Sequence, residues 1–409
     1  MDFHVDIGPQ YEGETIRKED MYVEFGGPKA AAKFELVTMK RPDEVEHEKV
    51  EVVGPDIKDM REGSSQPLAI MVDIAGEKLE KDMEPVIERR LHMYSNYIEG
   101  IYHMNQRSDI WIRLSKSAFA KGFNSLKEFG EILIFLFTSE LSVIEKISVT
   151  FTTDEKKVQE LLPQALKVYQ ARDERLKGLR EEDVDVFYGC ILCQSFAPTH
   201  CCLITPERVA NCGAINWFDG RAASKLDPEG PIFEVQKGDL IDPVRGEYSG
   251  LDQVVAERSL GQYSQVYLHS AFEHPHTSCG CFQAILFYIP EVDAFGIVHR
   301  DFVGRTVIGQ TFSQIAGATS GGRQVEGICG MALELIRSPK FFQADGGLRR
   351  VVWMPRVIKE RYREAIPEDI YDKIATEETA KDTAELMEFL EKVGHPWIKG
   401  EVVLPILTG

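Results

Sequence analysis

The sequence predicts an α+β fold made of two mixed α/β domains, the second of which is rich in cysteine and glycine. Three observations support this prediction. Strand-like and helix-like periodicities alternate up to about residue 160, a charged helical stretch follows, and from Asp185 the composition shifts toward Gly, Cys, Phe and Thr. The chain has 409 residues, and domains commonly hold about 100–200 residues. We therefore expect one domain over residues 1–162 and a second over residues 163–409.

The first domain begins with strand-like runs at residues 49–53 and 68–74, which are apolar or β-branched and are bounded by glycine or proline. Apolar residues at three- and four-residue spacing then predict a helix from about residue 77 to residue 97. Alternation of apolar and polar residues predicts strands at 110–114 and 147–151.

Two helices of this region carry start signals. Ser125 is followed three residues later by Glu128, which predicts an N-cap with a capping box. Asp154 begins a charged amphipathic helix that extends to about residue 176 and is interrupted by Pro163. The high charge of this helix is typical of a connector between domains.

The second domain has short strand-like runs, and we expect no long helix before about residue 327. The clearest strand is the apolar run at residues 284–289. The tail from Glu360 is helical and charged, and residues 402–407 resemble a final apolar strand.

Charge and hydropathy exclude several classes of protein. With 47 Lys+Arg against 66 Asp+Glu, the net charge is −19, whereas a nucleic-acid-binding surface is basic. The longest apolar runs, such as residues 132–137, are far shorter than the ~20 residues that cross a membrane. Met1 is followed by polar residues without an apolar signal segment. We therefore expect a cytoplasmic protein.

The cysteines are clustered. Of the eight cysteines, only Cys329 lies outside one quarter of the chain; the others are Cys190, Cys193, Cys201, Cys202, Cys212, Cys279 and Cys281. A chain with an ample core needs no disulfides, and clustered thiols in an intracellular protein indicate metal or redox chemistry. We therefore expect the second domain to carry a metal cluster.

Four of these thiols suit a 4Fe-4S cluster. Cys190 and Cys193 form one Cys-x-x-Cys pair, and Cys202 and Cys212 follow at wider spacing. A structural zinc site needs the same four ligands, but such sites usually combine two close pairs, so the spacing favours iron–sulfur. Cys201 is surplus and is expected to be a buried side chain, although its position beside Cys202 leaves two candidates for one ligand.

The motif Cys279-Gly280-Cys281 suits a planar chelate. Both sulfurs and the amide nitrogens of Gly280 and Cys281 can surround one metal ion in five- and six-membered rings. Tetragonal or square-planar nitrogen and sulfur coordination is typical of Ni(II) or Cu(II) rather than of zinc. Thiolates in such a chelate keep lone pairs that can bridge to a second metal.

Three motifs resemble acetyl-CoA synthase, the carbonylating and methylating subunit of the CO dehydrogenase/acetyl-CoA synthase complex. They are Cys190-Ile-Leu-Cys-Gln-Ser-Phe-Ala-Pro-Thr-His200, Asn211-Cys-Gly-Ala-Ile-Asn-Trp217 and His276-Thr-Ser-Cys-Gly-Cys281. Residues 310–330 and 351–355 are also similar to the C-terminal region of that family. The resemblance covers essentially the whole chain.

The resemblance implies an active site with two nickel ions and a 4Fe-4S cluster, the A-cluster. Cys190, Cys193, Cys202 and Cys212 would hold the 4Fe-4S cluster, and Cys193 would also bridge to a proximal nickel, which copper or zinc can replace. Cys279 and Cys281 would bridge this nickel to a distal nickel, to which Gly280 and Cys281 supply nitrogens. Phe196 matches an aromatic side chain that crowds the proximal nickel; the alternative is an ordinary core aromatic.

The resemblance also implies substrates and partners. The family joins CO, a methyl group from a corrinoid iron–sulfur protein and coenzyme A into acetyl-CoA. Trp111 and Arg113 are the expected contacts of coenzyme A, with Arg107, Lys116 and Lys121 nearby in sequence; the alternative is a solvated edge strand. The bacterial form has an additional domain before the point that matches Met1, so we expect weak or absent coupling to CO dehydrogenase.

Some features stay open at this level. The glycine-rich run at residues 317–323 could bind phosphate, but it lacks the Gly-Lys-Ser/Thr ending of a P-loop, so a tight turn is favoured. His200, His274 and His276 flank the cysteines and are expected to form hydrogen bonds rather than to bind metal. The rival hypothesis is a non-catalytic iron–sulfur or zinc protein that transfers electrons or acts as a scaffold, and neither role needs Cys-Gly-Cys.

Overall fold

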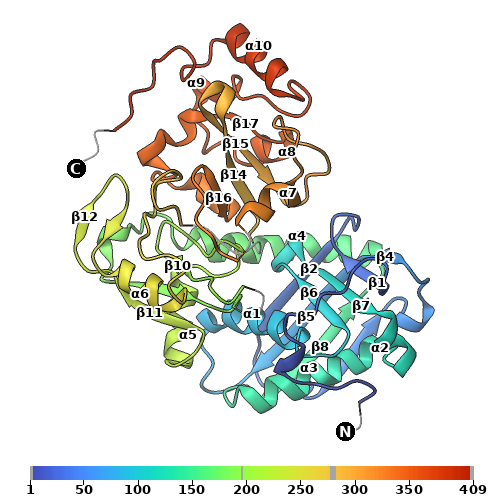
Figure 1. Cartoon of the computed structure of the whole chain (residues 1–409). Coiled ribbons are helices and arrows are strands. Elements are labelled where there is room, and N and C mark those ends of the chain that lie inside the picture. The colour runs from blue at the N-terminus through green and yellow to red at the C-terminus, as the bar shows by residue number, and fades with distance from the viewer. Residues whose placement is uncertain (1–2, 195–196, 277–281, 320, 406–409) are drawn as a thin grey trace. The chain divides into compact units, whose positions relative to one another are not determined.

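Two units make up the chain, Met1–Lys177 and Gly178–Gly409. The computed structural model describes residues 3–194, 197–276, 282–319 and 321–405, and its elements are labelled in Figure 1. Helices and mixed sheets occur in both units, so the predicted α+β class is confirmed. The domain boundary expected after residue 162 falls within helix α4 (Glu155–Glu174), and the two units divide after this helix. In the described part of the chain, no helix is long and apolar enough to cross a membrane.

The main sheet of the first unit has the strand order β2-β5-β8-β3. Its strands are β2 (Lys33–Met39), β5 (Leu68–Ala75), β8 (Lys146–Thr152) and β3 (Lys49–Val53). The central pair, β5 and β8, is antiparallel, and each outer strand runs parallel to its neighbour. The strands predicted at 49–53, 68–74 and 147–151 are therefore confirmed.

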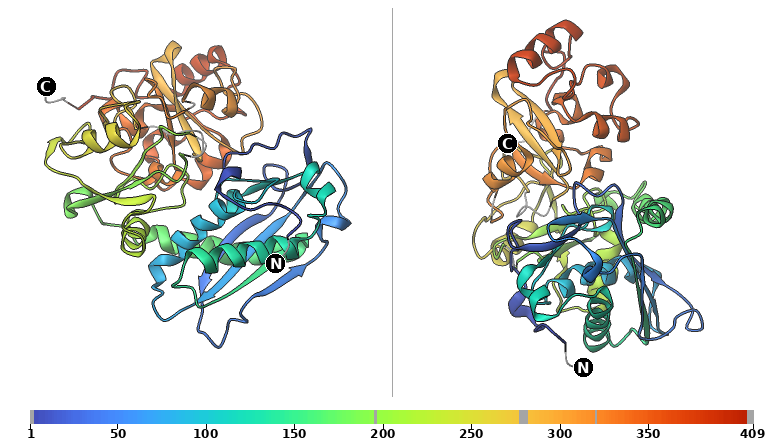
Figure 2. Two further views of the ribbon diagram at one scale, coloured as in Figure 1. Left: turned by 60° about the horizontal axis from the view of Figure 1, so that its bottom comes forward. Right: turned by 90° about the vertical axis from the view of Figure 1, so that its right-hand side faces the viewer.

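Helices cover both faces of this sheet, as the ribbon in Figure 2 shows. Helix α3 (Leu126–Glu140) packs on one face, where the rings of Phe129 and Phe151 stack with centroids 5.3 Å apart. Gly130 permits this close approach, because a Cβ atom there would lie 2.5 Å from the side chain of Val50. On the other face, α4 buries Val158, Ala165 and Tyr169 against β2 and β5. Burial on both faces explains why the central strand β5 is almost entirely apolar, whereas the outer strand β3 is half-exposed and carries Lys49 and Glu51.

Three helix predictions need correction. Helix α1 (Glu84–Ser95) begins later than predicted, after a short 3-10 turn, and Pro85 sits in its first turn, where proline is well tolerated. Ser125 is the N-cap of α3, but no capping box forms, because Glu128 instead accepts the backbone N–H of His4 at 2.7 Å. Pro163 lies inside α4 without ending it, so the predicted interruption is wrong.

A second sheet of the first unit has the order β4-β1-β7-β6. Its strands are β4 (Ser64–Gln66), β1 (Met21–Gly26), β7 (Trp111–Ser115) and β6 (Ile101–Met104), and the short helix α2 (Lys116–Lys121) follows β7. Strand β7 confirms the strand predicted at 110–114. It is a central strand, paired antiparallel with both β1 and β6, and not an edge strand.

Among its described residues, the second unit contains three sheets. One has the order β10-β9-β11, made of β9 (Val186–Cys190), β10 (Cys202–Ile204) and β11 (Ile232–Gln236). A hairpin joins β12 (Leu240–Asp242) and β13 (Glu247–Tyr248). The third has the order β16-β14-β15-β17, made of β16 (Ile328–Met331), β14 (Ala284–Ile289), β15 (Ala294–His299) and β17 (Val351–Trp353). Alternate residues of β14 enter two apolar clusters, one on each face of this last sheet.

Short helices connect and cover these sheets. They are α5 (Trp217–Leu226), α6 (Leu251–Arg258), α7 (Phe312–Ala316), α8 (Arg356–Arg361), α9 (Glu368–Tyr371) and α10 (Thr383–Val393). Helices α8 to α10 agree with the helical tail predicted from Glu360. The final strand predicted at 402–407 is wrong for residues 402–405, which are described and have no ladder partner; the side chain of Val403 is 88% exposed.

Candidate metal centre

Two of the predicted cluster ligands lie opposite each other in the β9–β10 ladder. Strand β9 ends at Cys190, strand β10 begins at Cys202, and the two residues are Cα partners in antiparallel register. Between the strands the chain turns through Cys193, whose carbonyl accepts the N–H of Ala197 at 2.9 Å. The sheet thus brings together residues that are twelve positions apart in the sequence.

A tight turn after β10 carries the fourth predicted ligand, Cys212. The N–H of Asn211 donates to the sulfur of Cys202 at 3.4 Å, so this turn is held directly against the β10 thiol. Gly213 follows with φ +75°, and a Cβ atom there would lie 2.4 Å from the side chain of Gln283. Only glycine fits this left-handed and crowded position without strain.

The described thiols are largely shielded from water. Five are buried and Cys212 is half-buried; the buried ones are Cys190, Cys193, Cys201, Cys202 and Cys329. Burial raises the pKa of Cys202 well above its usual value, and the neighbouring thiols of Cys190 and Cys212 raise it further. Burial likewise raises the pKa of Cys201 to about 12 and that of Cys329 to about 12.

This donor set fits a soft metal group. Burial and the neighbouring thiols disfavour a free thiolate at Cys202, and a soft metal ion is the kind of group that would stabilise thiolates at such a site. Within residues 3–194, 197–276, 282–319 and 321–405, no group of three or more His, Cys, Asp or Glu side chains is arranged as a finished metal site. The fit of a soft metal group therefore rests on the sulfur chemistry of these donors and on the closeness of Cys190, Cys202 and Cys212 to one another.

Four predicted site residues, Phe196, Cys279, Gly280 and Cys281, lie outside the described residues and stay predictions. The described residues on either side of the stretch 277–281 bond to neighbours of the cysteine ligands. His276 Nε2 accepts the N–H of Leu203, the residue after Cys202, at 2.8 Å. The N–H of Gln283 donates to the carbonyl of Asn211, the residue before Cys212, at 3.1 Å.

His276 is buried and neutral, and Arg208 lies against it. The N–H of Leu203 donates to Nε2 and the Arg208 guanidinium, which has only donors, faces Nδ1, so the neutral ring accepts from only one of the two; the contact from Leu203 is the shorter. Arg208 Nη1 lies 3.3 Å from Nδ1, and Nη2 donates to the carbonyl of Leu268 at 2.7 Å. Burial and then the charge of Arg208 lower the pKa of His276 well below its usual value. The ring is therefore an acceptor toward β10.

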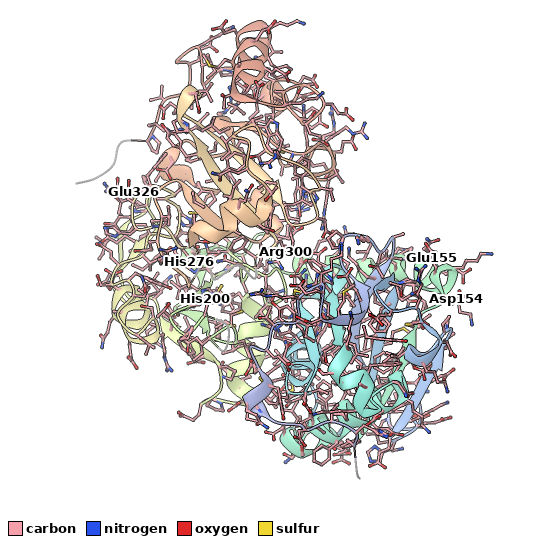
Figure 3. The ribbon with its side chains drawn as sticks, turned by 45° about the vertical axis from the view of Figure 1, so that its right-hand side comes forward. Asp154, Glu155, His200, His276, Arg300 and Glu326 are labelled. Carbon is pink, nitrogen blue, oxygen red and sulfur yellow. The ribbon has the colours of Figure 1, made fainter. Side chains whose placement is uncertain are left out.

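The glycine-rich run that we favoured as a tight turn over a phosphate loop begins with the 3-10 helix Gly317–Thr319, and residue 320 lies outside the described residues. Gly321 and Gly322 have φ of +78° and +77°, and the N–H of Gly322 donates to the carbonyl of Thr319 at 2.9 Å. The hydroxyl of Thr199 donates to the carbonyl of Gly321, so the turn contacts the loop that follows Cys193. His200 and His276 are labelled in Figure 3.

Glu181 forms a buried ionic centre beneath β10 that the sequence did not indicate. It accepts the hydroxyl of Thr205 at 2.6 Å, and it pairs with His269 at 2.9 Å and with Lys340 at 3.2 Å. Burial alone would raise the pKa of Glu181, but His269 and Lys340 outweigh burial and hold that pKa far below its usual value. No local pattern identifies Glu181 or Arg208, because their partners are distant in sequence.

The two predicted coenzyme A contacts lie together on β7. The guanidinium of Arg113 lies over the Trp111 ring, 4.7 Å from its centroid. Glu24 Oε2 accepts both the indole N–H of Trp111 at 2.7 Å and the Nε–H of Arg113 at 3.0 Å. The pair therefore has an anionic partner of its own chain.

The other basic residues near β7 are also paired. Arg107 pairs with Asp173 at 2.9 Å, Lys116 pairs with Glu62 at 2.8 Å, and Lys121 pairs with Glu99. Figure 3 labels Asp154 and Glu155 at the start of α4, the helix whose last turn supplies Asp173. Each of these cations therefore has an anionic partner within the chain, and the coenzyme A contacts stay a prediction.

Comparison with known proteins covers nearly the whole chain. The family described as CO dehydrogenase/acetyl-CoA synthase complex beta subunit matches residues 3–158, and the family of the C-terminal part of the ACS/CODH beta subunit matches residues 169–404. The acetyl-CoA decarbonylase/synthase complex subunit beta of Methanopyrus kandleri is 55% identical over 97% of this chain and 85% of its own length. Subunit beta 2 of Methanocaldococcus jannaschii is 55% identical over 97% and 83%, and subunit beta of Archaeoglobus fulgidus 53% over 99% and 77%. The chain belongs to the beta-subunit family of the acetyl-CoA decarbonylase/synthase complex.

Proposed function

We propose that this chain is an acetyl-CoA synthase, an acyltransferase that joins CO, a methyl group and coenzyme A into acetyl-CoA. The observation that carries the proposal is a set of buried thiols, centred on the Cys190–Cys202 pair, in a chain whose relatives of about 55% identity are acetyl-CoA decarbonylase/synthase beta subunits.

Seven residues would hold the metal group. Cys190, Cys193, Cys202 and Cys212 would bind a 4Fe-4S cluster; Cys279, Gly280 and Cys281 would bind two nickel ions, one of which Cys193 would bridge to the cluster. When bound, this group would supply the soft metal site at which CO and the methyl group combine. Phe196 would limit access to it.

The chain's own residues prepare this site in two ways. The N–H of Asn211, directed at the sulfur of Cys202, stabilises negative charge on that ligand. The burial of Cys190, Cys193 and Cys202 excludes water, which strengthens each electrostatic contact in the site.

The rival interpretation, a non-catalytic iron–sulfur or zinc protein, explains only part of these observations. It would account for the four clustered thiols of Cys190, Cys193, Cys202 and Cys212. It gives no reason for Cys-Gly-Cys in the sequence or for the similarity to synthase subunits over both units.

We also propose the substrates and partners of this activity. Coenzyme A would contact Trp111 and Arg113, and it would compete there with Glu24 for the guanidinium. A corrinoid iron–sulfur protein would supply the methyl group and CO dehydrogenase would supply CO, in the cytoplasm.

Metal analysis and isotope exchange test the proposal together. After anaerobic reconstitution, we expect about four irons and two nickels per chain, and exchange of labelled CO into the carbonyl of acetyl-CoA. Cys281→Ala should lose the exchange, whereas Cys329→Ala, which changes a buried cysteine of the β16 strand, should retain it. A chain that holds one zinc and no nickel, or a nickel-loaded chain without exchange, would contradict the proposal.

A further inference from the structure

We infer that His276 is a positioning residue for the metal centre: it holds the edge of β10, the strand that carries Cys202, by accepting the N–H of Leu203. The inference rests on the proposed function, because it assigns His276 a role toward the metal group of that function. It concerns only residues that the structure describes.

The bond satisfies a buried edge strand. In the order β10-β9-β11, strand β10 pairs with β9 on one side only. Leu203 is 0% exposed and His276 is 1% exposed, so the N–H of Leu203 is out of reach of water. A buried N–H without a partner is costly, and His276 Nε2 at 2.8 Å is the partner it has.

The imidazole is itself fixed in place. Arg208 lies 3.3 Å from Nδ1 on the far side of the ring and is anchored through Nη2 to the carbonyl of Leu268 at 2.7 Å. Arg208 belongs to the turn after β10, where it forms a bridge with Thr205. The buried ring thus lies between the backbone of Leu203 and the side chain of Arg208.

The position of β10 determines the position of one predicted ligand. Leu203 is the next residue after Cys202, and the sulfur of Cys202 also accepts the N–H of Asn211 at 3.4 Å. Loss of the His276 bond would free the edge of the strand and loosen the Cys202 sulfur relative to Cys190. Loss of a residue that orients a metal ligand without binding the metal itself typically lowers metal affinity about 10–100-fold.

The test compares two amides at position 276. The oxygen of a glutamine can occupy the place of Nε2, whereas that of an asparagine reaches only to Nδ1. His276→Gln keeps the acceptor for Leu203, and His276→Asn removes it while keeping a polar side chain. The full chain is reconstituted with iron and nickel, and the rate of iron loss to a chelator is measured with the thermal unfolding midpoint.

A second buried histidine supplies the matched control. His395 is 0% exposed and accepts a backbone N–H, that of Trp397 at 3.2 Å, through Nδ1. At this position glutamine removes the acceptor and asparagine keeps it. His395→Gln therefore removes a hydrogen bond from a backbone N–H to a buried histidine elsewhere in the second unit, and it leaves the contacts of β10 unchanged.

We expect iron loss about 10–100-fold faster in His276→Asn than in wild type, and wild-type rates in His276→Gln and His395→Gln. Equal rates in His276→Asn and wild type would overturn the inference, as would fast iron loss from His276→Gln, even if the Asn variant failed to fold. Failure of the wild-type chain to take up iron would instead overturn the proposed function.

Discussion

Cys190 and Cys202 are Cα partners at the end of β9 and the start of β10. Cross-strand partners project to the same face of a sheet, so the two thiols share one side of the ladder. Cys201 precedes Cys202 by one residue, and side chains one residue apart in an extended chain point to opposite sides. The register thus places Cys202, the first residue of β10, beside Cys190, whereas Cys201 precedes the strand and is not part of the register.

This register gives the first prediction. Cys202→Ala should abolish binding of the iron–sulfur cluster, and Cys201→Ala should keep about four irons per chain. The buried Cys201 should cost only packing energy, of about 1 kcal/mol. Iron analysis after anaerobic reconstitution, with thermal unfolding as the control for folding, distinguishes the two. If only Cys201→Ala loses iron, Cys201 rather than Cys202 is the cluster ligand, and the prediction is wrong.

The second prediction concerns coenzyme A. Glu24 accepts hydrogen bonds from both Trp111 and Arg113, so its charge opposes a phosphate at the same guanidinium. Glu24→Gln should lower the KM for coenzyme A about threefold to fivefold, the range of a partly exposed ion pair of up to ~1 kcal/mol. Arg113→Gln should raise the KM about tenfold or more, since hydrogen bonds to charged groups contribute about 1.5–3 kcal/mol.

Lys116→Gln is the matched control for this prediction. Its partner Glu62 is 2.8 Å away, and the side chains of both residues are about half exposed. The KM for coenzyme A should therefore stay near the wild-type value. If Arg113→Gln and Lys116→Gln change the KM equally, β7 does not contact coenzyme A specifically.

Elements with strong local periodicity could be predicted from the sequence. Strands β3, β5 and β8 were predicted because each shows a local pattern, either alternation of apolar and polar residues or an apolar run. Such a pattern depends only on which faces of the strand are buried and not on the identity of distant partners. Helix α1 was predicted too long, because apolar spacing continues into residues 77–83, where the chain forms an irregular turn followed by the 3-10 helix Lys81–Met83.

Side-chain partners could be predicted far less well. Glu128 was expected to cap its own helix, but it bonds His4, 124 residues away. Arg208 and Glu181 have no sequence signal, because an arginine or a glutamate in a loop is usually exposed. The cysteines could be predicted as a set because metal ligation fixes residue type and spacing, whereas a supporting hydrogen bond does not.

The third prediction concerns the buried Glu181. Its partners include His269 at 2.9 Å and Lys340 at 3.2 Å. Lys340 keeps Glu182 and Glu207, each at 2.7 Å, so Glu181→Gln removes only the buried carboxylate that pairs with His269 and accepts from Thr205, and it should lower the free energy of unfolding by about 1–3 kcal/mol. Glu182→Gln, which changes a half-exposed partner of the same lysine, should cost less than about 1 kcal/mol. Chemical denaturation of the metal-free chain measures both.

The pH dependence of this prediction has a definite sign. The pKa of Glu181 is lowered in the folded chain from its ordinary value of 4.5. The stabilisation is therefore fully present above pH 4.5 and declines as the pH falls below that value toward the folded pKa. The difference in stability between wild type and Glu181→Gln should shrink as the pH falls below 4.5; a difference that grows over this acid range would contradict the assignment.

The fourth prediction concerns Asp345, whose carboxylate accepts the N–H of Ala271 and the hydroxyl of Ser270. Burial raises the pKa of Asp345 from 3.8 to about 6, despite these bonds and the charge of Arg350. The folded chain thus binds a proton more tightly than the unfolded chain, and this group's contribution to stability falls as the pH rises from about 4 to 6. At pH 7.5 the ionised Asp345 costs about 2–3 kcal/mol relative to a neutral group.

Asp345→Asn should therefore gain stability relative to wild type between pH 5 and pH 7.5, because an amide keeps one acceptor for Ala271 and carries no charge. Asp345→Ala loses both bonds and should be less stable than Asp345→Asn at either pH. The thermal unfolding midpoints of the metal-free wild type and both variants, measured at pH 5 and pH 7.5, test this prediction. A relative stability of Asp345→Asn that does not change with pH means that Asp345 has an ordinary pKa in the folded chain.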